Sequence, residues 1–77
     1  MPTLKQVAAG RVALKKAVSI MGSQTVLAHA IGVRQSTLNY WLGNGKVPAE
    51  KCEPIELATG RKVLRRELRP DIFGSDK

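Results

Sequence analysis

The sequence predicts an all-α fold that contains a helix-turn-helix, and three observations support this prediction. Apolar residues recur at helical spacing along most of the chain, and no segment carries a strong strand pattern. Glycines separate the periodic segments where helices commonly end. Two of these segments, within about residues 23–42, are joined by one short turn. The chain of 77 residues is therefore expected to form one small domain, residues 1–77, with four or five helices.

The first helix is expected over residues 4–21. Its buried side carries four apolar residues at helical spacing: Leu14, Ala17, Val18 and Met21. Gly10 lowers the helical propensity of its first half. The helix should stop at Gly22, and Ser23 can then cap the next helix by accepting a backbone N–H with its hydroxyl.

The helix-turn-helix is the most informative part of the chain. A second helix should end near Ile31, because Gly32 can adopt the left-handed conformation that terminates a helix. Ala28 is small enough for a following helix to cross it, and Val33 fills the turn. A third helix, from about residue 35 to residue 42, turns three apolar side chains inward: Leu38, Trp41 and Leu42.

The remaining elements are expected to be short helices at about residues 53–69. The glycine-rich segment 43–45 should end the third helix, and Pro48 should begin a new turn. We expect the fourth helix to begin near Glu53, because Pro54 is tolerated in a first turn but not further in. Gly60 should end that helix, residues 61–64 should be extended, and a last helix should cover residues 65–69, before Pro70.

Charge is distributed unevenly along the chain. The formal net charge is +7 at pH 7, yet residues 1–49 contain no Asp or Glu at all. All the acidic residues lie in the last part of the chain, where basic residues nearly balance them. The helix-turn-helix therefore belongs to a uniformly positive half, which favours attraction to phosphates.

The outward side of the third helix carries hydrogen-bonding side chains and no acid. Gln35 is the leading base reader, because its amide can pair with N6 and N7 of adenine and it lies at the end of the helix that enters the major groove. Gln24, at a helix N-terminus, can join free backbone N–H groups around one phosphate. Bases or phosphates are the expected contacts of the other candidates: Arg34, Ser36, Thr37, Asn39, Tyr40 and Lys46.

Two features of the C-terminal part allow more than one interpretation. The basic pairs 61–62 and 65–66 (Arg61, Lys62, Arg65 and Arg66) either extend the phosphate contacts or form a solvated face. Ile72 and Phe73 are apolar and late in the chain, so they either cover the core or meet a partner.

Several motifs resemble a known family. Residues 32–39 (Gly-Val-Arg-Gln-Ser-Thr-Leu-Asn) closely resemble the Cro repressor of phage lambda. Residues 13–73 as a whole look like the YdaS-like family of Cro-type prophage regulators and proposed antitoxins. The matching motifs are Ala28–Gly32, Tyr40–Trp41, Gly45–Cys52, Ile55–Glu56, Ala58–Gly60 and Leu68–Phe73.

This resemblance implies a lambda-repressor-like domain that regulates transcription by binding operator DNA. In Cro-like proteins the residue matching Gln24 holds a phosphate, and those matching Gln35 and Ser36 read bases. The residue matching Asn39 lies at the DNA surface. Arg34 and Tyr40 depart from the pattern, since a Ser or Thr cap and, in lambda Cro, a lysine stand there.

No set of residues in the sequence predicts catalysis, a cofactor or a metal site. One cysteine, Cys52, and one histidine, His29, cannot form a structural zinc site. No apolar run approaches the roughly 18 residues of a membrane span, and no signal peptide is visible, so a cytoplasmic location is expected.

The expected partner is a double-stranded DNA operator. One helix-turn-helix reads only a few base pairs, so we expect a homodimer, at least on DNA, with Ile72 and Phe73 as candidates for the dimer surface. The alternative function is that of an antitoxin or interaction module that binds a partner protein through the same apolar residues.

Overall fold

The computed structural model describes residues 4–73, and over this range it contains six helices and no strand. The helices are α1 (Leu4–Met21), α2 (Gln24–Ile31), α3 (Gln35–Asn44), α4 (Ala49–Ala58), α5 (Arg65–Leu68) and α6 (Pro70–Phe73). The predicted all-α class is confirmed, with α6 as a helix beyond the four or five expected. The predicted domain range, 1–77, extends past the described residues at both ends.

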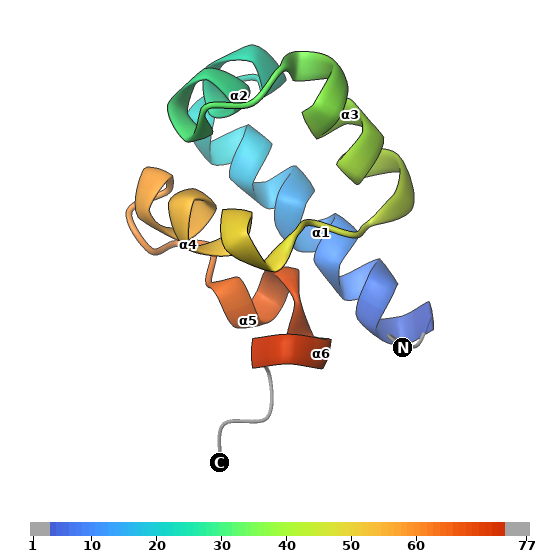
Figure 1. The fold of residues 1–77 in the computed structure, drawn as a ribbon. Coiled ribbons are helices and arrows are strands. Elements are labelled where there is room, and N and C mark those ends of the chain that lie inside the picture. Colours follow the sequence, from blue (N-terminus) through green and yellow to red (C-terminus); the bar gives the residue numbers. More distant parts are fainter. Residues whose placement is uncertain (1–3, 74–77) are drawn as a thin grey trace.

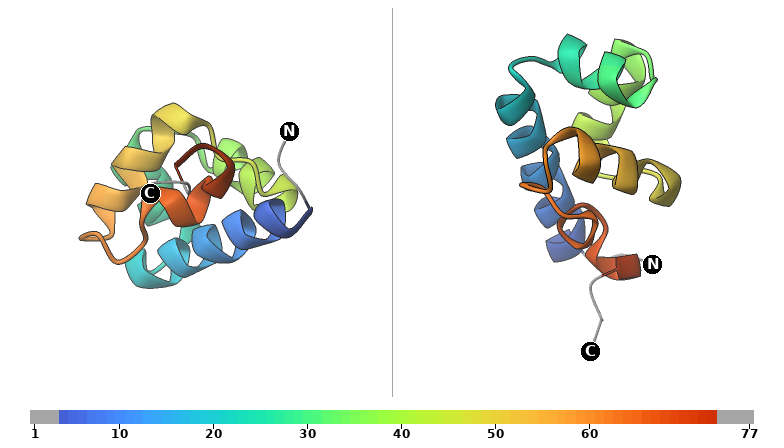
Figure 2. Two further views of the ribbon diagram at one scale, coloured as in Figure 1. Left: turned by 90° about the horizontal axis from the view of Figure 1, so that it is seen from below. Right: turned by 90° about the vertical axis from the view of Figure 1, so that its left-hand side faces the viewer.

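The long helix α1 crosses the whole molecule, and the other helices pack along it (Figure 1). Helix α2 lies at the C-terminal end of α1, α3 runs back alongside α1, and α5 and α6 lie towards the N-terminal half of α1 (Figures 1 and 2). Helix α1 packs against α2, α3, α5 and α6, while α4 packs against α2 and α5. The helix-turn-helix and the C-terminal helices are therefore both positioned by α1.

The first two helices have the bounds and caps that the sequence predicted. The Oγ atom of Ser23 accepts a hydrogen bond from the Val26 N–H at 3.2 Å, as an N-cap does. Gly32 has φ 75°, in the left-handed region, and ends α2. Ala28 is buried, and its carbonyl accepts the Val33 N–H at 3.0 Å, which closes the turn that leads into α3.

Helix α3 is longer than predicted, because it ends at Asn44 and not at Leu42. Gly43 keeps helical backbone, and only Gly45, with φ 71°, takes the left-handed conformation. The Gly45 N–H donates to the Trp41 carbonyl at 2.7 Å, and Asn44 Oδ1 accepts the Lys46 N–H at 2.8 Å. The glycine-rich segment therefore ends the helix at its second glycine.

The predicted start of the fourth helix, near Glu53, is wrong. Helix α4 begins at Ala49, directly after Pro48, so Pro54 lies in its second turn. Pro54 has no N–H to donate to the carbonyl four residues earlier, which is Glu50. Cys52 and Ile55 on either side of it are completely buried, and this burial offsets the missing hydrogen bond.

The segment after α4 is a tight turn and not the extended stretch that was predicted. Gly60 and Arg61 both have φ 65°, and the Arg61 N–H donates to the Glu56 carbonyl at 2.8 Å. The buried Thr59 hydroxyl accepts the Val63 N–H at 3.2 Å. These bonds turn the chain back on itself, so that Val63 enters the core.

The C-terminal end also differs from the prediction of one helix over residues 65–69. Helix α5 ends at Leu68, and Pro70 begins the separate helix α6. Phe73 packs against the core, with the Arg65 guanidinium 5.5 Å from its ring centre. Ile72 is 45% exposed, so the two candidate residues for a partner surface have different environments.

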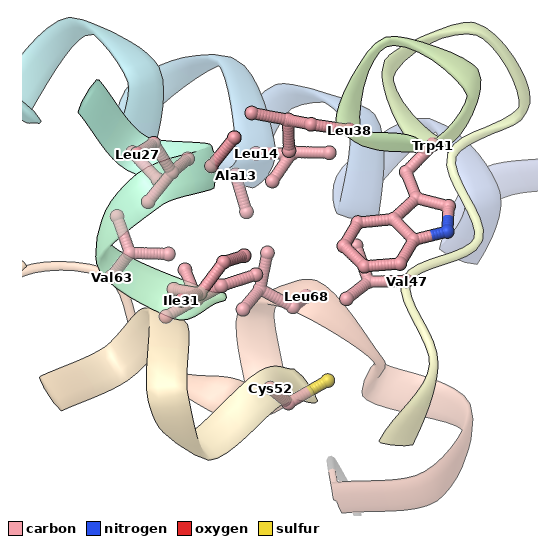
Figure 3. Close-up of a cluster of buried hydrophobic side chains, with 13 residues drawn as sticks. Ala13, Leu14, Leu27, Ile31, Leu38, Trp41, Val47, Cys52, Val63 and Leu68 are labelled. Atoms are coloured by element: carbon pink, nitrogen blue, oxygen red, sulfur yellow. The ribbon is translucent and has the colours of Figure 1, made fainter. Parts of the chain in front are cut away.

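The core draws its side chains from α1 to α5 and from the loops between them (Figure 3). The fully buried members include Leu14, Leu27, Leu38, Val47, Ile55, Val63 and Leu68. Trp41 belongs to this cluster and is only 7% exposed, which confirms its predicted inward position. Of the predicted stripe on α1, Leu14 and Ala17 are buried, while Val18 and Met21 pack at the edge of the core.

Helix α1 passes unusually close to two other parts of the backbone. A Cβ atom placed on Gly10 would lie 2.6 Å from the Leu68 carbonyl oxygen and 3.0 Å from that of Gly45. A Cβ on Gly45 would lie 2.7 Å from the Val7 carbonyl oxygen. The glycine that weakened the helix prediction is therefore needed where α1 meets the ends of α3 and α5.

A half-buried arginine ties the last helices to the loop that follows α3. Arg69 donates through Nη1 to the Val47 carbonyl at 2.8 Å. Its Nε and Nη2 atoms donate to the two Asp71 carboxylate oxygens at 3.0 and 2.8 Å. These hydrogen bonds lower the pKa of Asp71 and raise that of Arg69. The bidentate pair fixes the guanidinium plane against the loop.

We predict that Gly10→Ala and Gly43→Ala change stability in opposite directions. Alanine at position 10 should lower the free energy of unfolding by about 1–3 kcal/mol, because backbone atoms block its methyl group. Position 43 has no heavy atom within 4 Å of an added Cβ, so alanine there should stabilise α3 by about 0.5–1 kcal/mol. Urea unfolding of both variants measures the difference, and equal effects would contradict the packing argument.

Candidate DNA interface

The outward face of α3 is a row of exposed polar side chains. Leu38 and Trp41 point into the core, so the helical period places Gln35, Ser36 and Asn39 on the opposite side. All three are exposed. Tyr40 flanks this row and is 70% exposed, the highest value among the large hydrophobic residues of the described chain.

Four of the predicted DNA-contacting residues surround one shallow hollow. Gln24, from the start of α2, faces three residues of α3 across it: Gln35, Ser36 and Asn39. The hollow encloses about 480 Å³ and is open to solvent. The start of α2 and the outward face of α3 therefore form one continuous polar surface.

The N-terminus of α2 adds backbone donors to this surface. The Ser23 hydroxyl accepts the Val26 N–H and the Ser23 carbonyl accepts the Leu27 N–H, while the N–H groups of Gln24 and Thr25 have no partner within the helix. Such free N–H groups at the positive end of a helix dipole attract anions. The predicted role of Gln24 in holding a phosphate is consistent with this placement.

A side-chain hydrogen bond connects the two helices at the hollow. The Thr25 Oγ1 hydroxyl donates to Gln35 Oε1 at 3.1 Å. Thr25 has no distinguishing signal in the sequence, because its relation to Gln35 depends on how α2 packs against α3.

The other predicted residues do not line this hollow. Arg34 is the exposed N-cap of α3 and makes no side-chain cap hydrogen bond. Thr37 is half-buried, and Lys46 is exposed beyond the end of α3. Arg34 and Lys46 therefore lie at opposite ends of α3, just before its first turn and just after its last.

Lys15 is a further basic residue beside the site that the candidate list omitted. It lines a second hollow together with Gln24, Asn39 and Leu42, where α1 passes next to the helix-turn-helix. Lys15 therefore lies beside Gln24, the predicted phosphate contact. In the sequence, only the positive charge of Lys15 indicates a contact with DNA, because the residues around it come from α2 and α3.

The acid-free half of the chain does not present all its charge to this surface. Arg11 donates through Nη2 to the Gly43 carbonyl at 3.0 Å, near the negative end of the α3 dipole. Lys5 and Lys16 border a separate, mainly apolar hollow between α1 and the C-terminal helices, which is also lined by Ala8, Ala9, Val12, Arg66, Glu67 and Pro70. The positive charge near the helix-turn-helix is thus provided by Lys15, Arg34 and Lys46.

The basic residues of the C-terminal part have mixed environments. Arg65 lies 3.9 Å from the Glu56 carboxylate, and its guanidinium lies 5.5 Å from the Phe73 ring centre, although its side chain is still 52% exposed. Arg61, Lys62 and Arg66 are exposed. The contacts of Arg65 with Glu56 and Phe73 argue against a phosphate contact for Arg65, and both interpretations stay open for Arg61, Lys62 and Arg66.

Cys52 lies in the core, whereas His29 is exposed on α2. Cys52 is buried, and burial raises the pKa of its thiol to about 11, which keeps it protonated at neutral pH. Within residues 4–73, no three His, Cys, Asp or Glu side chains are grouped as a metal site would require. No helix in that range is long and apolar enough to cross a membrane.

The helical arrangement and the polar outer face of α3 define a helix-turn-helix domain. Its family is established by sequence: the chain belongs to the YdaS family, whose model, described as "Bacterial toxin YdaS", matches residues 14–77.

Two known proteins, one curated sequence and one solved structure, are similar to this chain. A protein of Escherichia coli strain K12, named "Putative transcriptional regulator YdaS", is 44% identical over 59 residues. The match covers 75% of this chain but only 60% of that protein's length. A solved structure, the Cro protein from "putative prophage element Xfaso 1" in Xylella fastidiosa strain Ann-1, is 48% identical and superimposes with a TM-score of 0.79. It covers 82% of this chain and 97% of the Cro chain, and neither relative is named as an enzyme.

Proposed function

We propose that this protein is a sequence-specific regulator of transcription of the Cro type, which binds double-stranded operator DNA. The observation that carries the proposal is the polar surface shared by the start of α2 and the outward face of α3. Gln35 and Ser36 would read base edges in the major groove, with Asn39 and Tyr40 beside them. Gln24 and the free N–H groups of α2 would hold a phosphate.

Charge supports the same orientation on DNA. Lys15, Arg34 and Lys46 lie around this surface, and no acidic residue precedes position 50. Positive side chains at three sides of the reading helix can contact the phosphates that border one major groove. The relatives support the class of function, since one is named as a transcriptional regulator and the other as a Cro protein.

The first test is salt-dependent binding to DNA from the chain's own operon. With about four phosphate contacts, affinity should fall about a hundredfold between about 50 and 200 mM salt. Mobility shifts over this range, with excess unrelated DNA as competitor, measure both the salt slope and the specificity. An affinity that does not change with salt would exclude the electrostatic model, and equal competition by unrelated DNA would exclude specific reading.

A second prediction separates base contacts from phosphate contacts. Gln35→Ala should cost roughly 1–3 kcal/mol on the preferred site and weaken the preference at one base pair. Lys46→Ala should weaken binding to all sequences alike and lower the salt slope by about one unit. Selection of bound sites from a random DNA pool shows the difference. An unchanged ranking of sites with Gln35→Ala would remove Gln35 from the base-reading role.

We further propose that two copies bind together on a pseudo-palindromic operator. A single α3 contacts only a few base pairs, whereas a pair related by a two-fold axis reads two half-sites roughly 34 Å apart. Ile72, which is 45% exposed, is the best candidate for the dimer surface. Phe73 packs against the core, so a change there would alter the fold as well as any interface.

Ile72→Ser should therefore abolish cooperative operator binding without loss of folding. Leu57→Ser on α4 is the matched control, because Leu57 is also an exposed apolar residue, at 57%. Footprinting and sedimentation of the protein–DNA complex report cooperativity and stoichiometry. One protein bound per DNA at saturation, over a single half-site, would refute the dimer.

Binding of a partner protein, as a toxin or antitoxin does, is the second candidate function. The name of the family model favours it, and so does the mainly apolar hollow between α1 and the C-terminal helices, bordered by Lys5 and Lys16. This surface is separate from the polar surface of α2 and α3, so both functions can coexist in one chain. Growth arrest on expression of a Gln24→Ala, Gln35→Ala, Lys46→Ala triple variant, which should lose most of its DNA binding, would support the protein-binding function.

A further inference from the structure

We propose that Thr25 is a positioning residue, which orients the Gln35 amide and thereby sets the preference of α3 at one base pair. The inference rests on the proposed function, because it assumes that Gln35 faces a base. It goes further by assigning specificity to a residue of α2 that lies outside the reading helix.

The evidence is the hydrogen bond between the two helices. Thr25 Oγ1 lies 3.1 Å from Gln35 Oε1, and the two residues are separated by ten positions in the sequence. Both side chains are exposed, so packing does not hold the Gln35 amide in place. This hydrogen bond is the interaction in the described structure that restrains the end of that side chain.

The chemistry of the amide explains why such a restraint matters. The last torsion of a glutamine is broad and roughly two-fold, so a free amide presents either its oxygen or its nitrogen in a given direction. A hydroxyl that donates to Oε1 turns the oxygen towards α2 and leaves both Nε2 hydrogens free. Oε1 retains one further lone pair, because a carbonyl oxygen accepts two hydrogen bonds.

This fixed orientation favours adenine over bases that present only acceptors. Adenine needs one acceptor for its N6 amine and one donor for N7, and the restrained amide offers both side by side. Guanine presents two acceptors, N7 and O6. One of them would face Oε1, which is also an acceptor, so no hydrogen bond would form there. A released amide can rotate and offer only its NH₂ group. Loss of the Thr25 hydroxyl should therefore move the preference from adenine towards guanine or thymine.

The test begins with the free protein and two matched substitutions. Thr25→Ser keeps the hydroxyl, and Thr25→Val keeps the shape but removes it. In NMR spectra, Thr25→Val should shift the Gln35 side-chain amide protons, and Thr25→Ser should leave them close to wild type. The side-chain amide of Asn44, which accepts the Lys46 N–H through Oδ1, is the internal reference. Unchanged Gln35 resonances in Thr25→Val would overturn the positioning role.

The second arm measures base preference in a double-mutant cycle. In the wild-type background, Thr25→Val should reduce the discrimination for the preferred base at one position about two- to tenfold, the range of a single hydrogen bond. With Gln35→Ala present, Thr25→Val should have no further effect on the ranking of sites. An equal effect in both backgrounds would show that Thr25 contacts DNA by itself, and would overturn the proposal.

The two arms distinguish this inference from the proposed function. If wild-type protein selects no DNA site, the proposed function fails, and the role of Thr25 in specificity fails with it, whatever the NMR arm shows. If wild-type protein selects a site and Thr25→Val leaves the ranking unchanged, only the inference about Thr25 fails.

Discussion

The close backbone contact of α1 with the ends of α3 and α5 is the constraint on which the structure depends. At Gly10 the helix lies directly against the carbonyl oxygens of Gly45 and Leu68. This contact places the end of the reading helix and the C-terminal helices against one rigid element. Arg11, on the next position, adds a hydrogen bond to the Gly43 carbonyl. The orientation of α3 is thus fixed at the end far from the turn with α2.

Local signals in the sequence predicted the elements whose ends depend on neighbouring residues alone. Ser23 and Gly32 act within one turn of their helix, and α1 and α2 have the predicted bounds. The later helices could not be predicted in this way. Pro54 lies inside α4 because the burial of Cys52 and Ile55 outweighs one lost hydrogen bond, and that burial depends on α2 and α5.

The candidate site, too, could be predicted from the sequence only where it depends on a single helix. The sequence predicted a wider outward set on and before α3, and the structure brings three of its members, Gln35, Ser36 and Asn39, to one hollow, while Thr37 is half-buried. The contributions of Lys15 and Thr25 come from other helices, so they became visible only once those helices were packed. Charge counted along the sequence overstated the positive charge available to DNA, since Arg11 donates a hydrogen bond to the Gly43 carbonyl at the end of α3.

The separation of the two faces of α3 has a consequence for how such proteins can diverge. Leu38 and Trp41 hold the helix in the core, while the exposed side chains opposite them contribute little to folding. Descendants of one ancestral gene can therefore exchange the exposed residues with little loss of stability. New side chains can therefore arise on the exposed face of α3 one substitution at a time, without compensating changes in the core.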